Sequence, residues 1–222
     1  VTLDSKPKLD EEITITAADV DTIKGTRSRL ITGAKLPRQE LLRLALMSSE
    51  NRAAAALART YPGGRTAFIK MMNQKAQTLG MDHTHFVDPA GLSRGNISTA
   101  QELAKMVAAA SRYSLITQFT TTASHTVDLD SRHTSVEFRN TNRLIQAQDE
   151  RWDIELSKTG YTAEAGRCLV MKARIAELPV IIVLLDSWGN LTPIGDANRI
   201  KRWIETRYAA HQLATTDASL KR

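Results

Sequence analysis

Two short polar motifs in the sequence contain side chains that can move protons and bind anions. Ser49 and Asn51 form a Ser-x-Asn motif, and Lys158, Thr159 and Gly160 form a Lys-Thr-Gly triplet much later in the chain. A hydroxyl can relay a proton, an amide can donate and accept hydrogen bonds, and an ammonium can pair with a carboxylate. These residue types suit cleavage of an amide bond in a peptide that carries a carboxylate.

Each residue of the two motifs has an expected role and an ordinary structural alternative. The hydroxyl of Ser49 can relay a proton, and the side-chain amide of Asn51 can hydrogen-bond the backbone amide of a peptide. Lys158 would pair with Ser49 and with a substrate carboxylate. Thr159 would donate its hydroxyl, and Gly160 would leave room for a peptide to add along the strand edge. In the alternative reading, Ser49 only caps the helix that follows it, and the triplet is a strand end with its turn.

Helical periodicity predicts how the first motif is held. Pro37 precedes a leucine-rich stretch that runs to Leu46, and an alanine-rich stretch follows from Asn51 to Arg59. The Ser-x-Asn motif therefore lies in the short connection between two predicted helices. Two further helices are predicted over residues 65–79 and from residue 99.

The second half of the chain is predicted to form a sheet. Residues 168–175 and 178–186 form a hairpin whose second strand is apolar enough to be central. A closing amphipathic helix over residues 196–208 packs on that sheet. These elements predict an α+β domain, in which a helical region over about residues 23–112 lies beside an antiparallel sheet region over about residues 150–208.

Alternation along the first strand of this region predicts the direction of the Lys158 side chain. Trp152, Ile154 and Leu156 alternate with polar residues. Lys158 has the same parity as these three residues, so we expect it to leave the sheet on the face that packs toward the helices. This direction would point the ammonium into a cleft between the two regions.

Composition limits the classes of protein that the chain can belong to. Its 222 residues are 42% hydrophobic and 24% charged, which predicts one globular domain over residues 1–208 and a polar tail over residues 209–222. The net charge of +6 favours anionic partners. Nucleic acid is not expected, because the basic residues are scattered and aromatic residues are few. The apolar run Val180–Leu185 is far shorter than the roughly 18 residues of a transmembrane helix.

No metal site is predicted. Cys168 is the single cysteine, which excludes an internal disulfide and a thiolate metal cluster. We interpret it as a packed thiol on an apolar strand. His83 and His85, with the nearby Asp82 and Asp88, match no metal-binding spacing and are interpreted as turn residues.

The motifs and the sequence around them resemble the serine D-alanyl-D-alanine peptidases of the penicillin-binding protein family, and in particular their penicillin-binding protein 7 type endopeptidases. The likeness extends from Val1 to about Tyr208. It is carried by the stretches Met47–Ala54, Phe86–Ser93 with Ser98–Ala100, Phe138–Asn142 and Lys158–Thr162.

The resemblance implies a fold, a reaction and a location. The fold would be that of β-lactamases and DD-peptidases, with the cleft between helices and sheet, and Asn140 and Asn142 at its border. The activity would be cleavage of peptide crosslinks in peptidoglycan through an acyl-serine intermediate, without a metal or cofactor. By the same resemblance, Ser49 would relay a proton between the lysine base and the leaving amine, and Asn51 would hydrogen-bond the backbone amide of the substrate. Peptidoglycan peptide stems would be the substrates, β-lactam antibiotics the inhibitors and the periplasm the compartment.

The first signature motif of that family, S-x-x-K, is not found in a suitable context. Ser5–Lys8 has the spacing, but Pro7 lies inside the motif and no apolar helix follows it. By resemblance, the nucleophilic serine and its lysine base lie before Val1, so we expect an N-terminally truncated domain that is inactive alone. Two alternatives stay open, a murein-binding protein without catalysis and a β-lactamase-like hydrolase.

Overall fold

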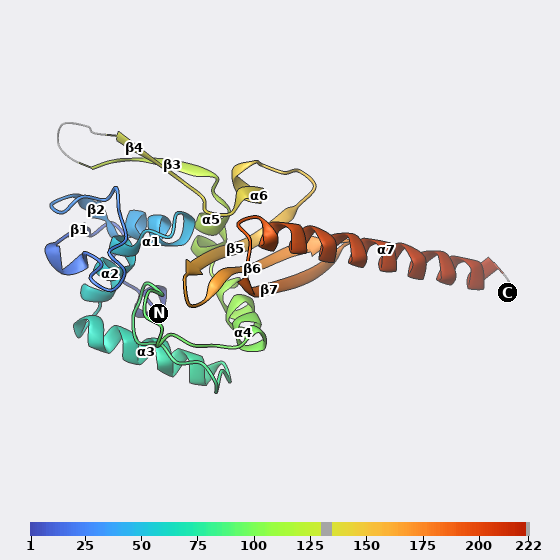
Figure 1. The fold of residues 1–222 in the computed structure, drawn as a ribbon, viewed down its shortest axis with the longest axis horizontal. Coiled ribbons are helices and arrows are strands. Elements are labelled where there is room, and N and C mark those ends of the chain that lie inside the picture. Colours follow the sequence, from blue (N-terminus) through green and yellow to red (C-terminus); the bar gives the residue numbers. More distant parts are fainter. Residues whose placement is uncertain (130–134, 221–222) are drawn as a thin grey trace.

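The computed structural model describes residues 1–129 and 135–220, with side chains described as far as residue 210. Helices and short strands of the first half lie on one side of the molecule, and a three-stranded antiparallel sheet lies on the other (Figure 1). The elements in chain order are η1 (Leu3–Ser5), β1 (Glu12–Thr14), η2 (Ala17–Asp19), β2 (Lys35–Pro37), α1 (Arg38–Met47), α2 (Asn51–Arg59), α3 (Gly64–Thr78), α4 (Ala100–Ala110), α5 (Ser114–Thr121), β3 (Ser124–Asp128), β4 (Ser135–Arg139), α6 (Arg143–Gln146), β5 (Asp153–Thr162), β6 (Gly166–Ile175), β7 (Leu178–Ser187) and α7 (Thr192–Leu220).

Helices α1 and α2 form where the periodicity predicts them. Pro37 directly precedes α1, where its fixed φ angle suits the start of a helix. Glu50 caps α2, because its carboxylate accepts the backbone N–H of Arg52 at 3.1 Å. Both helices bury apolar faces in a core that also takes in the hairpins β1–β2 and β3–β4 and helix α5.

The main sheet has the order β5–β6–β7, and each pair of neighbours is antiparallel. Ala176 and Glu177 connect β6 to β7 with φ angles of 47° and 63°, which match the twist of a two-residue hairpin turn. The prediction that the second hairpin strand is central is wrong, because β6 lies between the other two strands. A continuous apolar run therefore identified a well-buried hairpin but not which strand is central.

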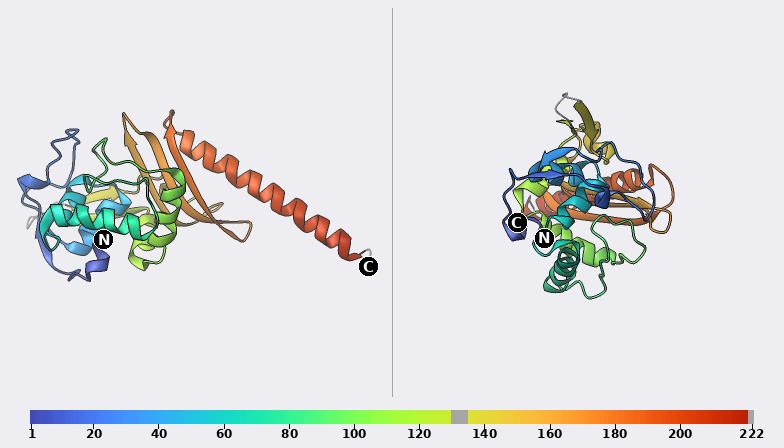
Figure 2. Two further views of the ribbon diagram at one scale, coloured as in Figure 1. Left: turned by 90° about the horizontal axis from the view of Figure 1, so that it is seen from below. Right: turned by 90° about the vertical axis from the view of Figure 1, so that its left-hand side faces the viewer.

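Helices cover both faces of the sheet. Helices α4 and α5 contact it on one side, and the first part of α7 packs on the other (Figure 2). The alternate side chains of β6 on the α7 side form a second core with residues of β7 and α7. This layering leaves the β5 end of the sheet beside the α1–α2 junction.

A β-bulge in β5 changes the face on which its side chains lie. Ile154 pairs with Ala173 and Leu156 pairs with Lys172, so Glu155 has no partner of its own on β6. Ala173 belongs to the core on the α7 side. Lys172, on the opposite face, has its ammonium 3.4 Å from the hydroxyl of Ser111 at the end of α4.

The bulge corrects one sequence expectation and preserves its conclusion. Because partners across an antiparallel pair point to the same face, Lys158 shares a face with Leu156 but not with Ile154. The predicted common parity of Trp152, Ile154 and Lys158 is therefore wrong. Lys158 nevertheless leaves the sheet toward the helical region, as expected.

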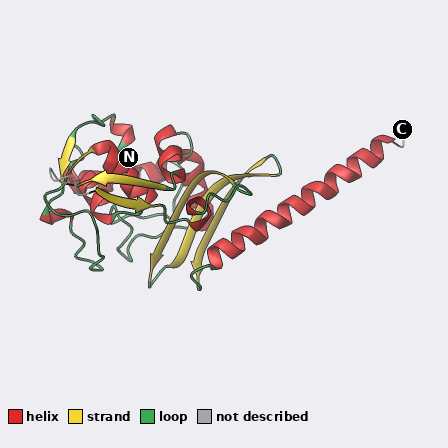
Figure 3. Ribbon diagram, turned by 90° about the horizontal axis from the view of Figure 1, so that it is seen from above, coloured by secondary structure: helices red, strands yellow, loops and turns green. Residues whose placement is uncertain are grey.

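Helix α7 is longer than predicted at both ends. It runs through the predicted closing helix and continues through the predicted polar tail to Leu220. Figures 2 and 3 show its C-terminal part extending away from the sheet. Among the described residues, no helix combines the length and the apolar character that crossing a bilayer requires.

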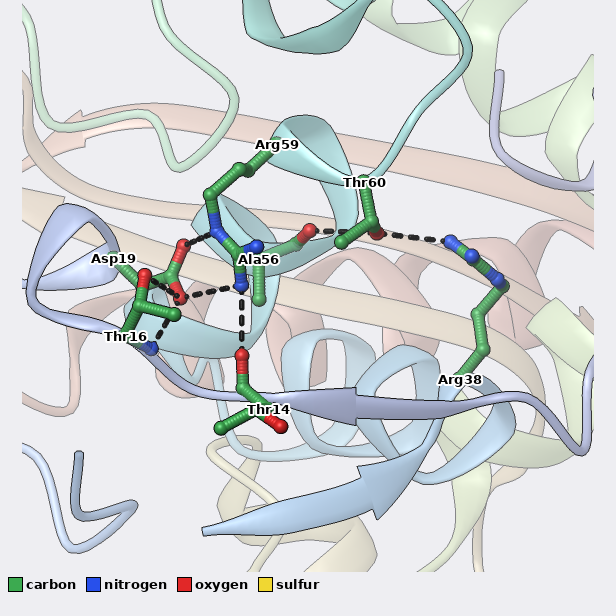
Figure 4. Close-up of polar contacts among 7 residues, drawn as sticks. All are labelled: Thr14, Thr16, Asp19, Arg38, Ala56, Arg59 and Thr60. Atoms are coloured by element: carbon green, nitrogen blue, oxygen red, sulfur yellow. Dashed lines mark hydrogen bonds and ion pairs between the residues drawn. The ribbon is translucent and has the colours of Figure 1, made fainter. Parts of the chain in front are cut away.

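A buried ion pair fastens the N-terminal segment to α2 (Figure 4). Asp19, which is 2% exposed, accepts hydrogen bonds from Nε and Nη2 of Arg59 at 2.8 and 2.9 Å. The Asp19 carboxylate also accepts the backbone N–H of Thr16, while Nη2 of Arg59 donates to the carbonyl oxygen of Thr14. Hydrogen bonding to Asp19 raises the pKa of Arg59 above its usual value. The ion pair between Asp19 and Arg59 therefore holds the last turn of α2, the helix whose first residue is Asn51.

We predict that Asp19→Ala lowers the free energy of unfolding by about 2–3 kcal/mol, because it leaves the Arg59 guanidinium partly buried without its counter-ion. Urea denaturation followed by circular dichroism measures this change. Asp153→Ala is the matched control, since Asp153 is an exposed partner of Arg174. Equal losses of unfolding free energy in the two variants would contradict the structural role of the ion pair between Asp19 and Arg59.

Candidate active site

Ser49 lies at the junction of α1 and α2, in a backbone conformation that few non-glycine residues adopt. Its φ angle is 55°, in the left-handed region. The junction is held on both sides, because the backbone N–H groups of Ser48 and Glu50 both donate to the carbonyl oxygen of Leu44. Glu50, not Ser49, supplies the side-chain cap of α2. The alternative that Ser49 serves as a helix cap is therefore wrong.

The Lys158 ammonium meets this junction from β5. It donates a hydrogen bond to Oγ of Ser49 and a second one, of 2.8 Å, to the backbone carbonyl oxygen of Thr159. The Lys158 stem is partly exposed, but protein atoms surround the ammonium. The resulting loss of hydration lowers the pKa of Lys158 to about 8. The two motifs are thus joined through one hydroxyl and one ammonium.

Asn51 is the first residue of α2 and faces the same space. Its Nδ2 donates to Oγ1 of Thr26 at 3.0 Å. Thr26 comes from the irregular segment between η2 and β2, which carries no predicted site residue. Glu50 ties a neighbouring residue of that segment to the junction by accepting the hydroxyl of Ser28 at 2.7 Å. Burial raises the pKa of Glu50, although the hydrogen bonds to its carboxylate oppose this change.

Thr159 points away from Lys158, toward the connection between β4 and α6. Its hydroxyl donates to Oγ1 of Thr141 at 2.6 Å. The backbone N–H of Thr141 donates in turn to the carbonyl oxygen of Met47 at the end of α1. Thr141 therefore links the triplet to the helix that leads into Ser49.

Asn140 and Asn142 hold that connection in place. Nδ2 of Asn140 donates to the backbone carbonyl oxygens of Thr120 and Thr122 at the end of α5, at 2.9 Å each. Asn142 caps α6 and donates to the hydroxyl of Ser157 at 2.8 Å. Both asparagines are buried, so they border the site as structural anchors while Thr141 between them faces the cavity.

One cavity of about 730 Å³ contains all five residues of the two motifs. Gly160 is exposed, and a Cβ atom added there would meet only Cβ of Cys168, at 3.8 Å. Among the described strands, β5 pairs only with β6, and its residues Gly160 and Tyr161 are exposed beside the cavity. The positive side chains of Lys158, Arg143 and Arg167 line this space, and Glu50 is the one acidic side chain in the described part of the lining. Such a lining favours a peptide that carries carboxylate groups.

The turn after α3, which the buried Asp88 holds together, forms another wall of the cavity. Asp88, which is 2% exposed, accepts backbone N–H groups from Ala90, Leu92 and Ser93 at distances between 2.8 and 3.2 Å. Residues 89–92 of this turn line the cavity. The interpretation of Asp88 as a turn residue therefore holds, and the turn itself belongs to the site.

A second cavity of about 850 Å³ shares Ser49, Glu50 and Asn51 with the first. The segment 27–29 and β4 form its walls. The Arg29 guanidinium lies 4.6 Å from the centre of the Phe138 ring and donates to the carbonyl oxygen of Glu137 at 2.6 Å. The junction that carries Ser49 therefore lines both cavities.

The other residues that the sequence offers as possible nucleophiles or metal ligands make structural contacts instead. Ser5–Lys8 lines neither cavity, and the hydroxyl of Ser5 bonds to the carbonyl oxygen of Thr2 at 2.7 Å. His83 contacts Glu102, and no group of three or more potential metal ligands occurs among the described residues. Cys168 is half-buried and lines the first cavity, so it is less enclosed than a packed core thiol.

Sequence reasoning missed several residues of the cavity wall. Thr26, Thr141, Arg143 and Arg167 line the cavity, but none was assigned a role from its local pattern. The stretch Phe86–Ser93 contributed to the family resemblance, which was a usable signal for the wall formed by residues 89–92. No local pattern marks Thr26, because its place depends on a contact with a residue 25 positions away.

Comparison with known proteins matches the chain to one family. A family model described as D-alanyl-D-alanine carboxypeptidase, peptidase S11, matches residues 2–189. The chain is 48% identical over 206 residues to a D-alanyl-D-alanine endopeptidase of Pseudomonas aeruginosa and 46% identical over 206 residues to one of Escherichia coli K12. Each match covers 93% of this chain and 66% of the relative, so the chain spans just under two thirds of their length.

Solved structures show the same fold. The crystal structure of the Streptomyces K15 DD-transpeptidase superposes with a TM-score of 0.79 at 29% identity, covering 90% of this chain and 80% of that chain. A mutant form of the same enzyme gives a TM-score of 0.80 at 30% identity, with 90% and 81% coverage. These matches confirm the predicted α+β fold of the DD-peptidase type. The chain belongs to the D-alanyl-D-alanine carboxypeptidase family, peptidase S11.

Proposed function

We propose that the chain carries the proton-transfer and substrate-binding part of a serine D-alanyl-D-alanine peptidase, and that the nucleophilic serine and its lysine base lie outside residues 1–222. The observation that carries this proposal is the hydrogen bond between Lys158 and Ser49 at the edge of a basic, peptide-sized cavity. Family membership supports the reaction class. Ser5–Lys8, which has the spacing of the nucleophile motif, lines neither cavity.

In the proposed reaction, the serine oxygen attacks the D-alanyl carbonyl carbon, the amide C–N bond breaks, and an acyl-serine remains for hydrolysis by water. Because Lys158 donates to Oγ of Ser49, the hydrogen of the Ser49 hydroxyl is free to point to another acceptor. Ser49 then passes this proton to the leaving amine and receives one from the base. Lys158 also stabilises negative charge on the substrate.

The proposed substrates are peptide stems of peptidoglycan, cleaved at their D-alanyl crosslinks. The edge of β5 opposite β6, which pairs with no described strand, allows an extended peptide to pair beside Gly160, and the basic lining attracts its carboxylates. The endopeptidase names of the relatives from Pseudomonas aeruginosa and Escherichia coli favour crosslink cleavage over removal of a terminal D-alanine. The proposed compartment is the periplasm, because peptidoglycan is the proposed substrate, and β-lactams are the expected inhibitors.

Two measurements on a full-length protein test this proposal. Intact mass spectrometry after incubation with benzylpenicillin should show a persistent adduct that maps outside residues 1–222, and crosslinked muropeptide dimers should be converted to monomers. Rapid turnover of benzylpenicillin would instead identify a β-lactamase-like hydrolase. A full-length protein that forms no adduct and cleaves no dimer would leave only a murein-binding role.

We predict that Ser49→Ala in the full-length protein lowers the rate constant of acylation by benzylpenicillin by about a hundredfold or more, because the proton relay is lost. Stopped-flow measurement of acylation gives this constant. Ser111→Ala is a matched control, since its hydroxyl bonds to a helix carbonyl oxygen away from both cavities. An unchanged rate in Ser49→Ala would remove Ser49 from the mechanism.

Acylation should also depend on pH through Lys158. Its pKa of about 8 means that the ammonium is present below this pH and is lost as the pH rises through it. We therefore expect kcat/KM for acylation to fall above about pH 8. Lys158→Arg should react more slowly but lose this alkaline fall, because a guanidinium stays charged. A wild-type profile that rises across this range would show that Lys158 acts in its neutral form.

A further inference from the structure

Asp21 holds together the segment between η2 and β2, which carries Thr26 to the cavity wall. Its Oδ1 accepts the backbone N–H groups of Ile23 and Lys24 at 2.7 and 3.1 Å, and its Oδ2 accepts the backbone N–H of Thr26 at 2.8 Å. Partial burial opposes ionisation of Asp21, but the hydrogen bonds from Thr26, Lys24 and Ile23 prevail and lower its pKa to about 2. Asp21 is therefore a carboxylate near neutral pH and can only accept hydrogen bonds.

The carboxylate determines what the Thr26 hydroxyl can do. Oγ1 of Thr26 donates its one hydrogen to Oδ2 of Asp21 at 2.8 Å. In its 3.0 Å contact with Nδ2 of Asn51, the Thr26 hydroxyl oxygen can therefore only accept a hydrogen bond. Only the NH₂ end of the Asn51 amide fits against it.

This restriction fixes the orientation of a side chain that is otherwise nearly symmetric in shape. Thr26 takes one N–H of the Asn51 amide and leaves the second N–H and the carbonyl oxygen Oδ1 for other partners. Thr26 and Asn51 both line the cavity that holds Lys158. The orientation therefore decides which hydrogen-bonding groups Asn51 offers to a ligand there.

We propose that Asp21 and Thr26 are positioning residues of the active site, which fix the amide orientation of Asn51 for binding the amide group of the substrate. This inference rests on the proposed function, because it requires a substrate amide beside Asn51. Neither residue transfers a proton to the substrate. Their effect passes through one side chain, so it depends on whether the ligand has the group that Asn51 recognises.

Two penicillins separate this role from a general loss of structure. Benzylpenicillin has a side-chain amide, and 6-aminopenicillanic acid lacks it. In the full-length protein, Thr26→Val should slow acylation by benzylpenicillin about tenfold and change acylation by 6-aminopenicillanic acid little. Thr26→Ser retains the hydroxyl and should restore most of the rate. Asp21→Asn should act in the same direction as Thr26→Val, because a neutral amide no longer forces the hydroxyl to donate to it.

Two controls complete the test. Thr78→Val makes the same chemical change on the exposed end of α3 and should leave both rates unchanged. In an Asn51→Ala background, Thr26→Val should have no further effect.

The outcomes distinguish the two proposals. A wild-type protein that forms no adduct with either compound overturns the proposed function and this inference together. The positioning role alone is overturned if the wild-type protein reacts and Thr26→Val slows acylation by both compounds equally. It is also overturned if Thr26→Val slows acylation by neither compound.

Discussion

The contact between the Lys158 ammonium and the Ser49 hydroxyl is the interaction on which the arrangement of this protein depends. An ammonium that loses hydration is costly unless oxygen atoms replace the lost water, and here Oγ of Ser49 and the carbonyl oxygen of Thr159 do so. The lowered pKa of Lys158 shows that the replacement is incomplete. The contact therefore survives only if the helices and the sheet are each held firmly enough to keep the two groups together.

The helical side meets this requirement by restraining one unfavourable backbone conformation from both directions. Ser49 is left-handed, which costs free energy for a residue with a side chain. Two backbone hydrogen bonds to Leu44 and the Glu50 cap offset this cost locally. Further along α2, the ion pair between Asp19 and Arg59 fixes the other end of the helix. The Ser49 hydroxyl thus projects from a strained point between two well-anchored helices.

Local patterns predicted the elements well, and failures arose where structure depends on distant contacts. Helix α2 has the predicted bounds, because alanine-rich periodicity and the breaking turn after it are local signals. The two site motifs were recognisable because their order in the chain and the residues around them together match one family, although each motif alone is too short to do so. The central position of β6 could not be read from the apolar run in β7, since hydrophobicity reports burial and not strand order. Thr26 was missed because its role follows from a three-residue hydrogen-bond chain.

Because of the bulge at Glu155, the number of residues between Ile154 and Lys158 decides the face of the sheet on which Lys158 lies. The additional residue shifts the alternation of β5, so that Ile154 before it lies on the α7 face and Lys158 after it lies on the helical face. A deletion between Glu155 and Lys158 that kept the bulge would move Lys158 opposite Met171 and send a cation into the apolar layer under α7. Homologous sequences are therefore expected to vary in composition here far more readily than in spacing.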